Sequence, residues 1–334
     1  MTFKIAVYGV RDNEVDYFKK LNQYQYELKL LPELLTHDNI DTAQGMDAVL
    51  LRANCVADAQ NLQKLHDWQI KYVFTRTVGF NHIDLQAAQD NGQIVARVPS
   101  YSPHAVADLA FTLGLTLQQR RVSWATHASH QKNFIVQPSE FTREIHDLKV
   151  GIIGTGRIGL TEAQNYHALG TKVIGYDVFQ SEAAKKIVDF KSQEEVFQTA
   201  DIVSLHVPYF PGKNDRFVNA DLINLMKPQA VLVNTARAEI VDISAVVAAL
   251  QNDRLSGFAT DVLDHEADYF GKKVDQIKDL NLQALIDLYP RVLITPHLGS
   301  YTEEALVDMI KISFDNFHEV LATGTCDNLV QPDK

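Results

Sequence analysis

The sequence predicts an α/β protein with two domains, each built on a parallel sheet covered by helices. Short apolar runs of strand type alternate with helical or turn patterns along most of the chain. A length of 334 residues is enough for two domains with sizeable cores. One strand-to-helix junction also carries a regular glycine pattern, between Gly154 and Gly159.

The first domain is predicted from five apolar runs near the N-terminus, at residues 3–9, 27–31, 47–51, 72–76 and 94–98. Amphipathic helices at 58–68 and 84–90 fill two of the gaps between them. A last helix, at 302–321, is expected to return to this domain because a chain end is ordered only when a core holds it. The smaller domain is therefore built from both chain ends, residues 1–100 plus 299–334, and residues 101–298 form the other.

Between the domains, Ser102 is a good N-cap and Pro103 a good first residue for a helix over 104–118. This helix is apolar almost all round, so it must be buried on more than one side. We expect a subunit interface in the 101–121 region, with burial inside the chain as the alternative.

The second domain begins with an apolar strand that ends at Ile153. Further strands are predicted at 172–176, 202–207, 230–235, 257–262 and 291–295, helices at 221–226 and 244–252, and a long polar excursion at 268–289.

The glycine pattern has the form G-x-G-x-x-G and is made of Gly154, Thr155, Gly156, Arg157, Ile158 and Gly159. The first glycine permits a tight turn, the second lets a pyrophosphate approach the backbone, and the third lets the helix pack on the strand. Gly170 is expected to end this helix as its C-cap. Asp177 ends the next strand, eighteen residues beyond Gly159, near the spacing of an acid that binds an adenosine ribose. No cation follows in 178–181, which favours NAD over NADP. These features predict two Rossmann-like domains, the second of which binds NAD; a glycine turn in another α/β protein is the alternative.

Composition excludes several classes of protein. The net charge of −11 and the lack of a basic stretch argue against a nucleic-acid partner. No apolar run is long enough to cross a membrane, and the N-terminus has no signal-peptide pattern. Cys55 and Cys326 are isolated, which suits the reducing cytoplasm and offers no metal-ligand spacing. We expect a cytoplasmic protein that acts on a small molecule without a metal.

Three polar side chains follow three late strands: Arg237, Glu266 and His297. Because ligands of open α/β sheets bind beyond the carboxyl ends of strands, we expect the three to converge. A histidine can give a proton to the alkoxide left by hydride transfer, a carboxylate beside it favours the protonated ring, and an arginine can clasp a substrate carboxylate. Each could instead be an ordinary surface or salt-bridge residue.

Other residues of these strand ends are candidates for cofactor binding. They are Asp261, for the nicotinamide amide, and His206, Val207, Pro208, Thr235 and Ala236. For Asp261 a structural hydrogen bond to a loop is the alternative, and for His206 a packed histidine is the favoured interpretation.

With these motifs, the chain resembles the D-isomer-specific 2-hydroxyacid dehydrogenases over essentially its whole length. The passages RTVGFNHID, VPSYSPHAVAD, VGIIGTGRIG, NTARAEIVD, DVLDHEADYF and TPHLGSYTEEA carry the resemblance. It implies that Arg237, Glu266 and His297 are catalytic. It also implies that Val78 and Gly79 bind the substrate carboxylate, that Tyr101 is an active-site tyrosine, and that the split domain closes as a lid in a homodimer.

Substrate choice depends on two positions. Compared with D-lactate enzymes, which the chain resembles, it has Arg52 in place of a tyrosine and Ser300 in place of an aromatic residue. A larger pocket with a cation favours a second carboxylate. Together with a resemblance to the (R)-2-hydroxyglutarate dehydrogenase branch, this predicts 2-oxoglutarate and (R)-2-hydroxyglutarate. The alternatives are D-lactate or a broad range of branched and aromatic 2-hydroxy acids. An NAD-sensing corepressor-like protein, or a methyltransferase with a similar glycine loop, is a further alternative.

Overall fold

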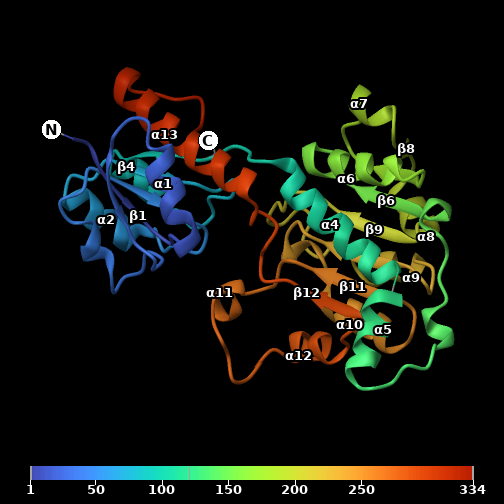
Figure 1. Cartoon of the computed structure of the whole chain (residues 1–334). Coiled ribbons are helices and arrows are strands. Elements are labelled where there is room, and N and C mark those ends of the chain that lie inside the picture. The colour runs from blue at the N-terminus through green and yellow to red at the C-terminus, as the bar shows by residue number, and fades with distance from the viewer. Residues whose placement is uncertain (1, 120, 333–334) are drawn as a thin grey trace. The chain divides into compact units, whose positions relative to one another are not determined.

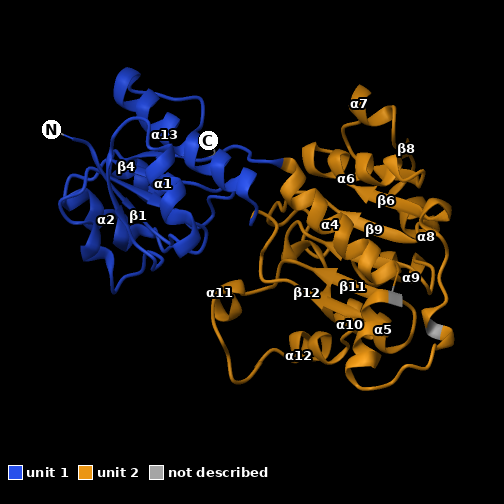
Figure 2. Ribbon diagram, viewed as in Figure 1, with its two compact units in different colours: residues 1–102, 301–334 blue, residues 103–300 orange. Residues whose placement is uncertain are grey.

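The computed structural model describes residues 2–119 and 121–332, which fall into two compact units (Figure 2). Unit 1 comprises residues 1–102 and 301–334, and unit 2 comprises residues 103–300. Unit 1 is thus built from both chain ends. Residues 1, 120, 333 and 334, which the predicted domains and interface include, lie outside the described residues. The predicted α/β fold with two mainly parallel sheets is confirmed.

The sheet of unit 1 has six strands in the order β13-β5-β4-β3-β1-β2 (Figure 1). Its five parallel strands are β1 (Lys4–Val7), β2 (Glu27–Leu30), β3 (Ala48–Leu51), β4 (Tyr72–Thr75) and β5 (Ile94–Ala96). The sixth, β13 (Leu329–Val330), pairs antiparallel with β5. The sequence analysis did not predict this edge strand, because two residues are too few to show the alternation of a strand.

Helices cover both faces of this sheet. They are α1 (Val15–Leu21), α2 (Ala59–Asp67), α3 (Leu85–Asp90) and α13 (Glu303–Thr323). On α13, Phe314 packs edge-on against Phe18 of α1 with ring centroids 6.2 Å apart, and Phe317 stacks on Phe74 of β4 at 4.2 Å. Buried aromatic pairs of this kind tie the C-terminal helix into the unit 1 core.

The sheet of unit 2 has seven strands in the order β12-β11-β10-β9-β6-β7-β8, all parallel. The strands are β6 (Lys149–Ile153), β7 (Lys172–Tyr176), β8 (Asp189–Phe190), β9 (Ile202–Leu205), β10 (Val231–Asn234), β11 (Gly257–Thr260) and β12 (Val292–Ile294). The order reverses on either side of β6, between β9 and β7. Such a reversal is where a crevice opens beyond the strand ends.

The helices of unit 2 are α4 (Pro103–Gln118), α5 (Arg121–His130), α6 (Arg157–Ala168), α7 (Glu182–Lys185), α8 (Gln193–Thr199), α9 (Ala220–Leu225), α10 (Ile243–Gln251), α11 (Glu266–Tyr269) and α12 (Leu280–Asp287). Helix α4 packs along α6 (Figure 1), where the rings of Phe111 and Tyr166 lie 4.7 Å apart. The polar excursion before β12 contains the short helices α11 and α12. Within the described part of the chain, no helix has the length and apolar character needed to span a membrane.

Candidate active site

The glycine loop joins β6 to α6 at the centre of the unit 2 sheet. Gly154 has a φ of +91°, a conformation that favours glycine. A Cβ on Gly159 would lie 2.0 Å from the carbonyl oxygen of Gly154, so the helix reaches its position only because residue 159 has no side chain. By contrast, a Cβ on Gly156 would meet nothing within 4 Å. Gly156 therefore borders open space at the N-terminus of α6, where a phosphate is favoured.

Asp177 lies directly beyond β7 and is bonded to the glycine loop. Its Oδ2 accepts from the backbone N–H of Thr155 at 2.5 Å and from the Thr155 hydroxyl at 3.2 Å. Its Oδ1 accepts from the N–H of Phe179 at 2.9 Å. The carboxylate thus fixes the loop, and Arg157 and Ile158 follow it as the first residues of α6.

His206 follows β9 and belongs to a buried pair that the sequence analysis missed. Its Nε2 lies within hydrogen-bonding distance of Glu162 Oε2 and 3.1 Å from the Ser204 hydroxyl. The side chains of His206 and Glu162 are 2% and 0% exposed. The imidazole is therefore packed inside the unit. The helical periodicity of α6 is the signal that could have indicated Glu162, because it lies three residues after Gly159 on the same buried face of the helix.

The backbone beside this histidine reaches the glycine loop. A Cβ on Gly154 would lie 2.7 Å from the carbonyl oxygen of His206, and 2.9 Å from a methyl of Val207. Pro208 follows and is exposed. At the next strand end, Thr235 is buried, and its hydroxyl has no hydrogen-bond partner among the described residues; half-buried Ala236 follows it. The unpaired, buried hydroxyl of Thr235 and the open space beside the Gly156 backbone suit a polar ligand that carries phosphates, such as NAD.

Glu266 and His297 are brought together at the ends of neighbouring strands β11 and β12. Nδ1 of His297 lies 2.9 Å from Oε2 of Glu266. The Leu263 N–H donates to the other oxygen, Oε1, at 3.3 Å. The carboxylate thereby orients the ring and leaves Nε2 as the nitrogen available for proton transfer.

Arg237 follows β10, the third strand in this row. Its side chain is exposed, and Nη1 donates to the carbonyl of Ala236 at 2.7 Å. Among the described residues, no hydrogen bond or ion pair joins this side chain to Glu266 or His297. The structure thus joins two of the three predicted residues directly and places the third at an adjacent strand end.

Asp261, predicted as a cofactor residue, holds the loop that carries His297. Its carboxylate accepts from the Thr295 hydroxyl at 2.6 Å and from the N–H groups of Leu298 at 2.7 Å and Gly299 at 2.8 Å. Burial raises the pKa of this carboxyl group above its ordinary value, against the opposing effect of these hydrogen bonds. These contacts within unit 2 are the ones expected if Asp261 holds a loop, which was the alternative to binding the nicotinamide amide.

The predicted substrate residues of unit 1 lie after its strands. The loop with Val78 and Gly79 is fixed by Arg97, which donates to the Val78 carbonyl at 3.0 Å, and by the Thr77 hydroxyl, which donates to the Gly79 carbonyl at 2.7 Å. Tyr101 is half-buried at the end of unit 1. Ser300 is half-buried too and belongs to unit 2.

Arg52 follows β3 and belongs to a group of cations. We define the arginine cluster as Arg11, Arg52 and Arg76 with Glu14. Arg76 and Glu14 form a buried ion pair of 2.9 Å, and Arg11 lies 3.5 Å from the same carboxylate. The carbonyl of Gly9 accepts from Arg76 at 2.8 Å and from Arg52 at 3.3 Å.

The cluster contains three cations and one carboxylate. Burial, followed by the charges of Arg11 and Arg76, lowers the pKa of Arg52 to about 10. Nε of Arg76 has no hydrogen-bond partner within the described residues. An excess of partly buried positive charge favours an anion beside Arg52. Sequence reasoning found Arg52 but not Arg76, although a charged residue that directly follows the apolar strand β4 is the signal to look for.

A glycine loop suited to NAD and a histidine–carboxylate pair beyond adjacent strands define the class of a nicotinamide-dependent oxidoreductase. Comparison with known proteins makes this specific. A family model described as "D-isomer specific 2-hydroxyacid dehydrogenase, NAD binding domain" matches residues 113–299. The chain belongs to the D-isomer-specific 2-hydroxyacid dehydrogenases, and it is an NAD-dependent enzyme that acts on the CH–OH group of its donor.

Its relatives match over nearly their whole length. The chain is 36% identical to an aromatic 2-oxoacid reductase of Clostridium sporogenes, over 97% of this chain and 98% of the relative. It is 33% identical to a D-lactate dehydrogenase of Lactiplantibacillus plantarum, over 99% and 100%. Among solved structures, the NAD complex of a D-isomer-specific 2-hydroxyacid dehydrogenase from Lactobacillus delbrueckii ssp. bulgaricus is similar, with a TM-score of 0.86 and 32% identity, covering 98% and 100%.

Two alanine substitutions in the glycine loop should separate folding from cofactor binding. Gly159→Ala forces α6 off β6, so its melting temperature should fall by about 5 °C. Gly156→Ala has room for the methyl group and should melt as the wild type does. It should nevertheless bind NADH at least about tenfold more weakly, equivalent to about 1.4 kcal/mol, because the methyl fills the space that a pyrophosphate needs. Wild-type NADH affinity in Gly156→Ala, measured by fluorescence titration, would contradict this assignment.

Proposed function

We propose that the chain reduces a 2-keto acid to the (R)-2-hydroxy acid, with His297 as the proton donor. The contact between His297 Nδ1 and Glu266 Oε2 at 2.9 Å carries this proposal. NADH supplies the hydride when it is bound. His297 then gives its Nε2 proton to the oxygen of the reduced carbon, and Glu266 stabilises the positive ring before the transfer.

The remaining predicted residues bind and orient the substrate in this scheme. Arg237 clasps the 2-carboxylate with two parallel hydrogen bonds, which a planar guanidinium can make and an ammonium cannot. In unit 1, the backbone at Val78 and Gly79 and the side chain of Tyr101 are also proposed to bind the substrate. Thr155, Arg157 and Asp177 bind the cofactor at the glycine loop. The candidate residues that follow strands β9, β10 and β11 line the rest of the cofactor.

For the substrate, we propose 2-oxoglutarate as the first candidate. The arginine cluster supports it, because Arg52 is a partly buried cation whose hydrogen bond in the structure goes to a carbonyl rather than a carboxylate. A distal substrate carboxylate would balance the excess positive charge of the arginine cluster. An aromatic 2-keto acid is the second candidate. The 36% and 37% identity to aromatic 2-oxoacid reductases of Clostridium sporogenes supports it.

A panel of keto acids tests the function and its substrate together. NADH oxidation is measured with 2-oxoglutarate, pyruvate, 2-oxoisocaproate and phenylpyruvate, and the product's configuration is determined by chiral chromatography. If Arg52 binds a distal carboxylate, Arg52→Ala should lose about 10- to 100-fold in kcat/KM for 2-oxoglutarate alone, the value of a charge-assisted hydrogen bond. Lys19→Ala, which removes an exposed cation from unit 1, is the charge-matched control.

The outcomes separate the candidates. Leading turnover of phenylpyruvate with an unchanged Arg52→Ala would contradict the 2-oxoglutarate proposal and favour the aromatic one. No turnover of any keto acid, with intact NADH binding, would contradict the reductase and favour the corepressor-like alternative.

We also propose a homodimer formed through the 101–121 region. Three apolar residues of α4 stay only half-buried, namely Leu109, Phe111 and Leu115. The segment that follows α5 adds apolar side chains that are 71% to 88% exposed, namely Phe134, Ile135, Val136 and Phe141. Exposed large apolar side chains are typical of protein–protein interfaces. Location in the cytoplasm stays a prediction, with which the buried Cys55 and Cys326 are compatible, since both are free thiols.

Sedimentation equilibrium tests the dimer. Wild type should sediment at twice the 37.5 kDa chain mass, and Leu109→Asp should shift toward the monomer because a buried carboxylate has no partner there. Leu280→Asp, at a residue that is 83% exposed on α12, should remain dimeric. A monomeric wild type would contradict the proposal.

A further inference from the structure

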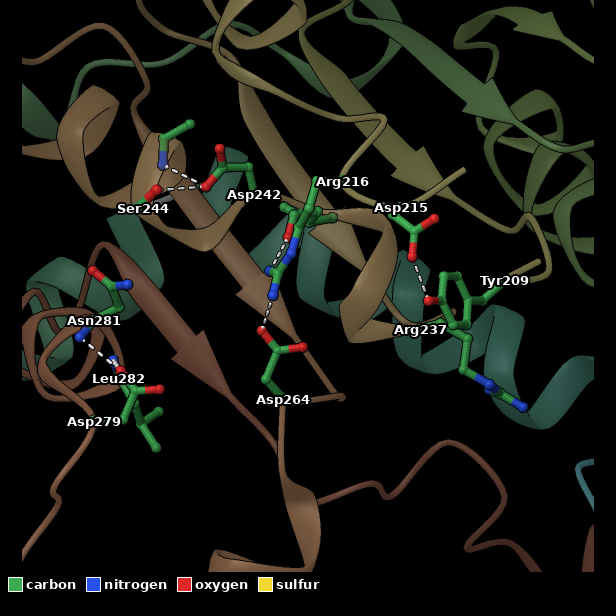
Figure 3. Close-up of polar contacts among 12 residues, drawn as sticks. Tyr209, Asp215, Arg216, Arg237, Asp242, Ser244, Asp264, Asp279, Asn281 and Leu282 are labelled. Carbon is green, nitrogen blue, oxygen red and sulfur yellow. Dashed lines mark hydrogen bonds and ion pairs between the residues drawn. The ribbon is translucent and has the colours of Figure 1, made fainter. Parts of the chain in front are cut away.

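Arg216 lies between the two segments that carry Arg237 and Glu266. Its Nη1 donates to the carbonyl of Val241 at 2.7 Å, and its Nη2 donates to Oδ2 of Asp264 at 2.7 Å. Its backbone N–H donates to the carbonyl of Glu239 at 2.8 Å. Figure 3 shows its guanidinium pointing at Asp264, whereas the side chain of Arg237 points away from this pair. One side chain therefore bridges the chain after β10 and the chain after β11.

The Asp264 end of this bridge leads directly to the proposed acid–base pair. The neighbouring residue, Leu263, donates its N–H to Glu266 Oε1, and Glu266 Oε2 contacts His297. His265, between Asp264 and Glu266, has a φ of +56°. A displacement of Asp264 would therefore be passed to Glu266 through a tight, strained turn of three residues.

The Val241 end leads to the other proposed catalytic segment. Arg237 begins the short turn that ends at Val241, and its own carbonyl accepts from the Asn234 side chain at 2.8 Å. Arg216 itself has a φ of +50°, which is unfavourable for a residue with a side chain. Strain of this kind persists only where surrounding contacts hold it, and here those contacts are the Arg216 bridge.

We propose that Arg216 is a positioning residue for the reduction. Its bridge from Val241 to Asp264 fixes the spacing between the substrate-clasping Arg237 and the Glu266–His297 pair. The proposal rests on the proposed function of that site. The Arg216 and Asp264 side chains are 46% and 24% exposed, so the ion pair itself adds little to the free energy of unfolding. Its contribution is to geometry, where a small displacement of reacting groups lowers the rate strongly.

A double-mutant cycle of Arg216→Ala and Asp264→Ala tests the bridge. Each single variant should lower kcat about tenfold, since displacement of reacting groups can cost up to about a hundredfold. The KM for NADH and the melting temperature should stay near those of the wild type. The double variant should be no slower than either single variant, because both changes break the same bridge. Arg216→Lys should recover only part of the lost rate, since one ammonium cannot hold two acceptors in a fork.

The matched control is Lys185→Ala, which removes another exposed ion pair of 2.7 Å, to Glu182 on α7 beyond β7. Strand β7 lies toward the edge of the sheet opposite to β11 and β12. This variant should keep the wild-type kcat. Losses of kcat in Arg216→Ala and Asp264→Ala that are no larger than the loss in Lys185→Ala, or fully additive losses in the double variant, would overturn the bridge.

One further readout distinguishes positioning from a general structural role. Amide hydrogen exchange of residues 263–270 should become about tenfold faster in either single variant without substrate, a change of about 1.4 kcal/mol in local opening. Unchanged exchange would overturn the inference. If wild type reduces no keto acid, the proposed function fails, and the exchange measurement still decides whether the bridge holds this segment.

Discussion

The buried carboxylate of Asp261 fixes the loop on which the proposed chemistry depends. It takes three hydrogen bonds from residues between Thr295 and Gly299, and its own backbone carbonyl accepts from the N–H of His297 at 3.1 Å. His297 adopts a φ of +55° within this loop. The hydrogen bonds offset the cost of a strained backbone and of a desolvated carboxylate. Glu266 can then contact the ring of His297, because the backbone of His297 is already held in place.

Buried charge is used differently in the two units. In unit 2, Glu162 contacts His206 at the end of β9, next to the glycine loop. The buried pair and the cofactor loop therefore share this strand end. In unit 1, Glu14 meets Arg76, but two further arginines leave a positive excess. Removing one partner of a buried ion pair lowers the free energy of unfolding, whereas a bound substrate anion can neutralise the excess charge of an unbalanced cluster. This contrast supports a scaffold role for the first pair and a binding role for the arginine cluster.

The sequence predicted the parts of the fold that depend on local pattern. Strand and helix periods indicated most strands of both sheets, and the glycine motif with Asp177 indicated where NAD binds. The fold and the cofactor are confirmed by the sheets and by the family. The two-residue strand β13 was missed because its pairing with β5 depends on a distant part of the chain.

The side-chain partners could not be predicted in the same way. Glu162 and Arg76 are charged residues in apolar surroundings, and only the folded packing brings His206 and Glu14 to them. The Arg216–Asp264 bridge joins residues 48 positions apart. Asp264 lies in the passage DVLDHEADYF, but no pattern in the sequence pairs it with Arg216. Strand ends predicted the meeting of Glu266 and His297 because neighbouring parallel strands finish at one edge. The role of Arg237 and the choice of keto acid remain proposals, since each depends on a bound substrate.

The rate of keto-acid reduction, compared among wild type, Glu266→Gln and His297→Gln, tests the central claim most directly. Reduction needs a proton from the ring of His297. Without the carboxylate 2.9 Å from Nδ1, the ring loses its fixed orientation, so Glu266→Gln should reduce the keto acid about tenfold more slowly. His297→Gln should bind NADH as the wild type does and lose most turnover. A wild-type rate in Glu266→Gln, or full turnover in His297→Gln, would contradict the assignment of His297 as the proton donor.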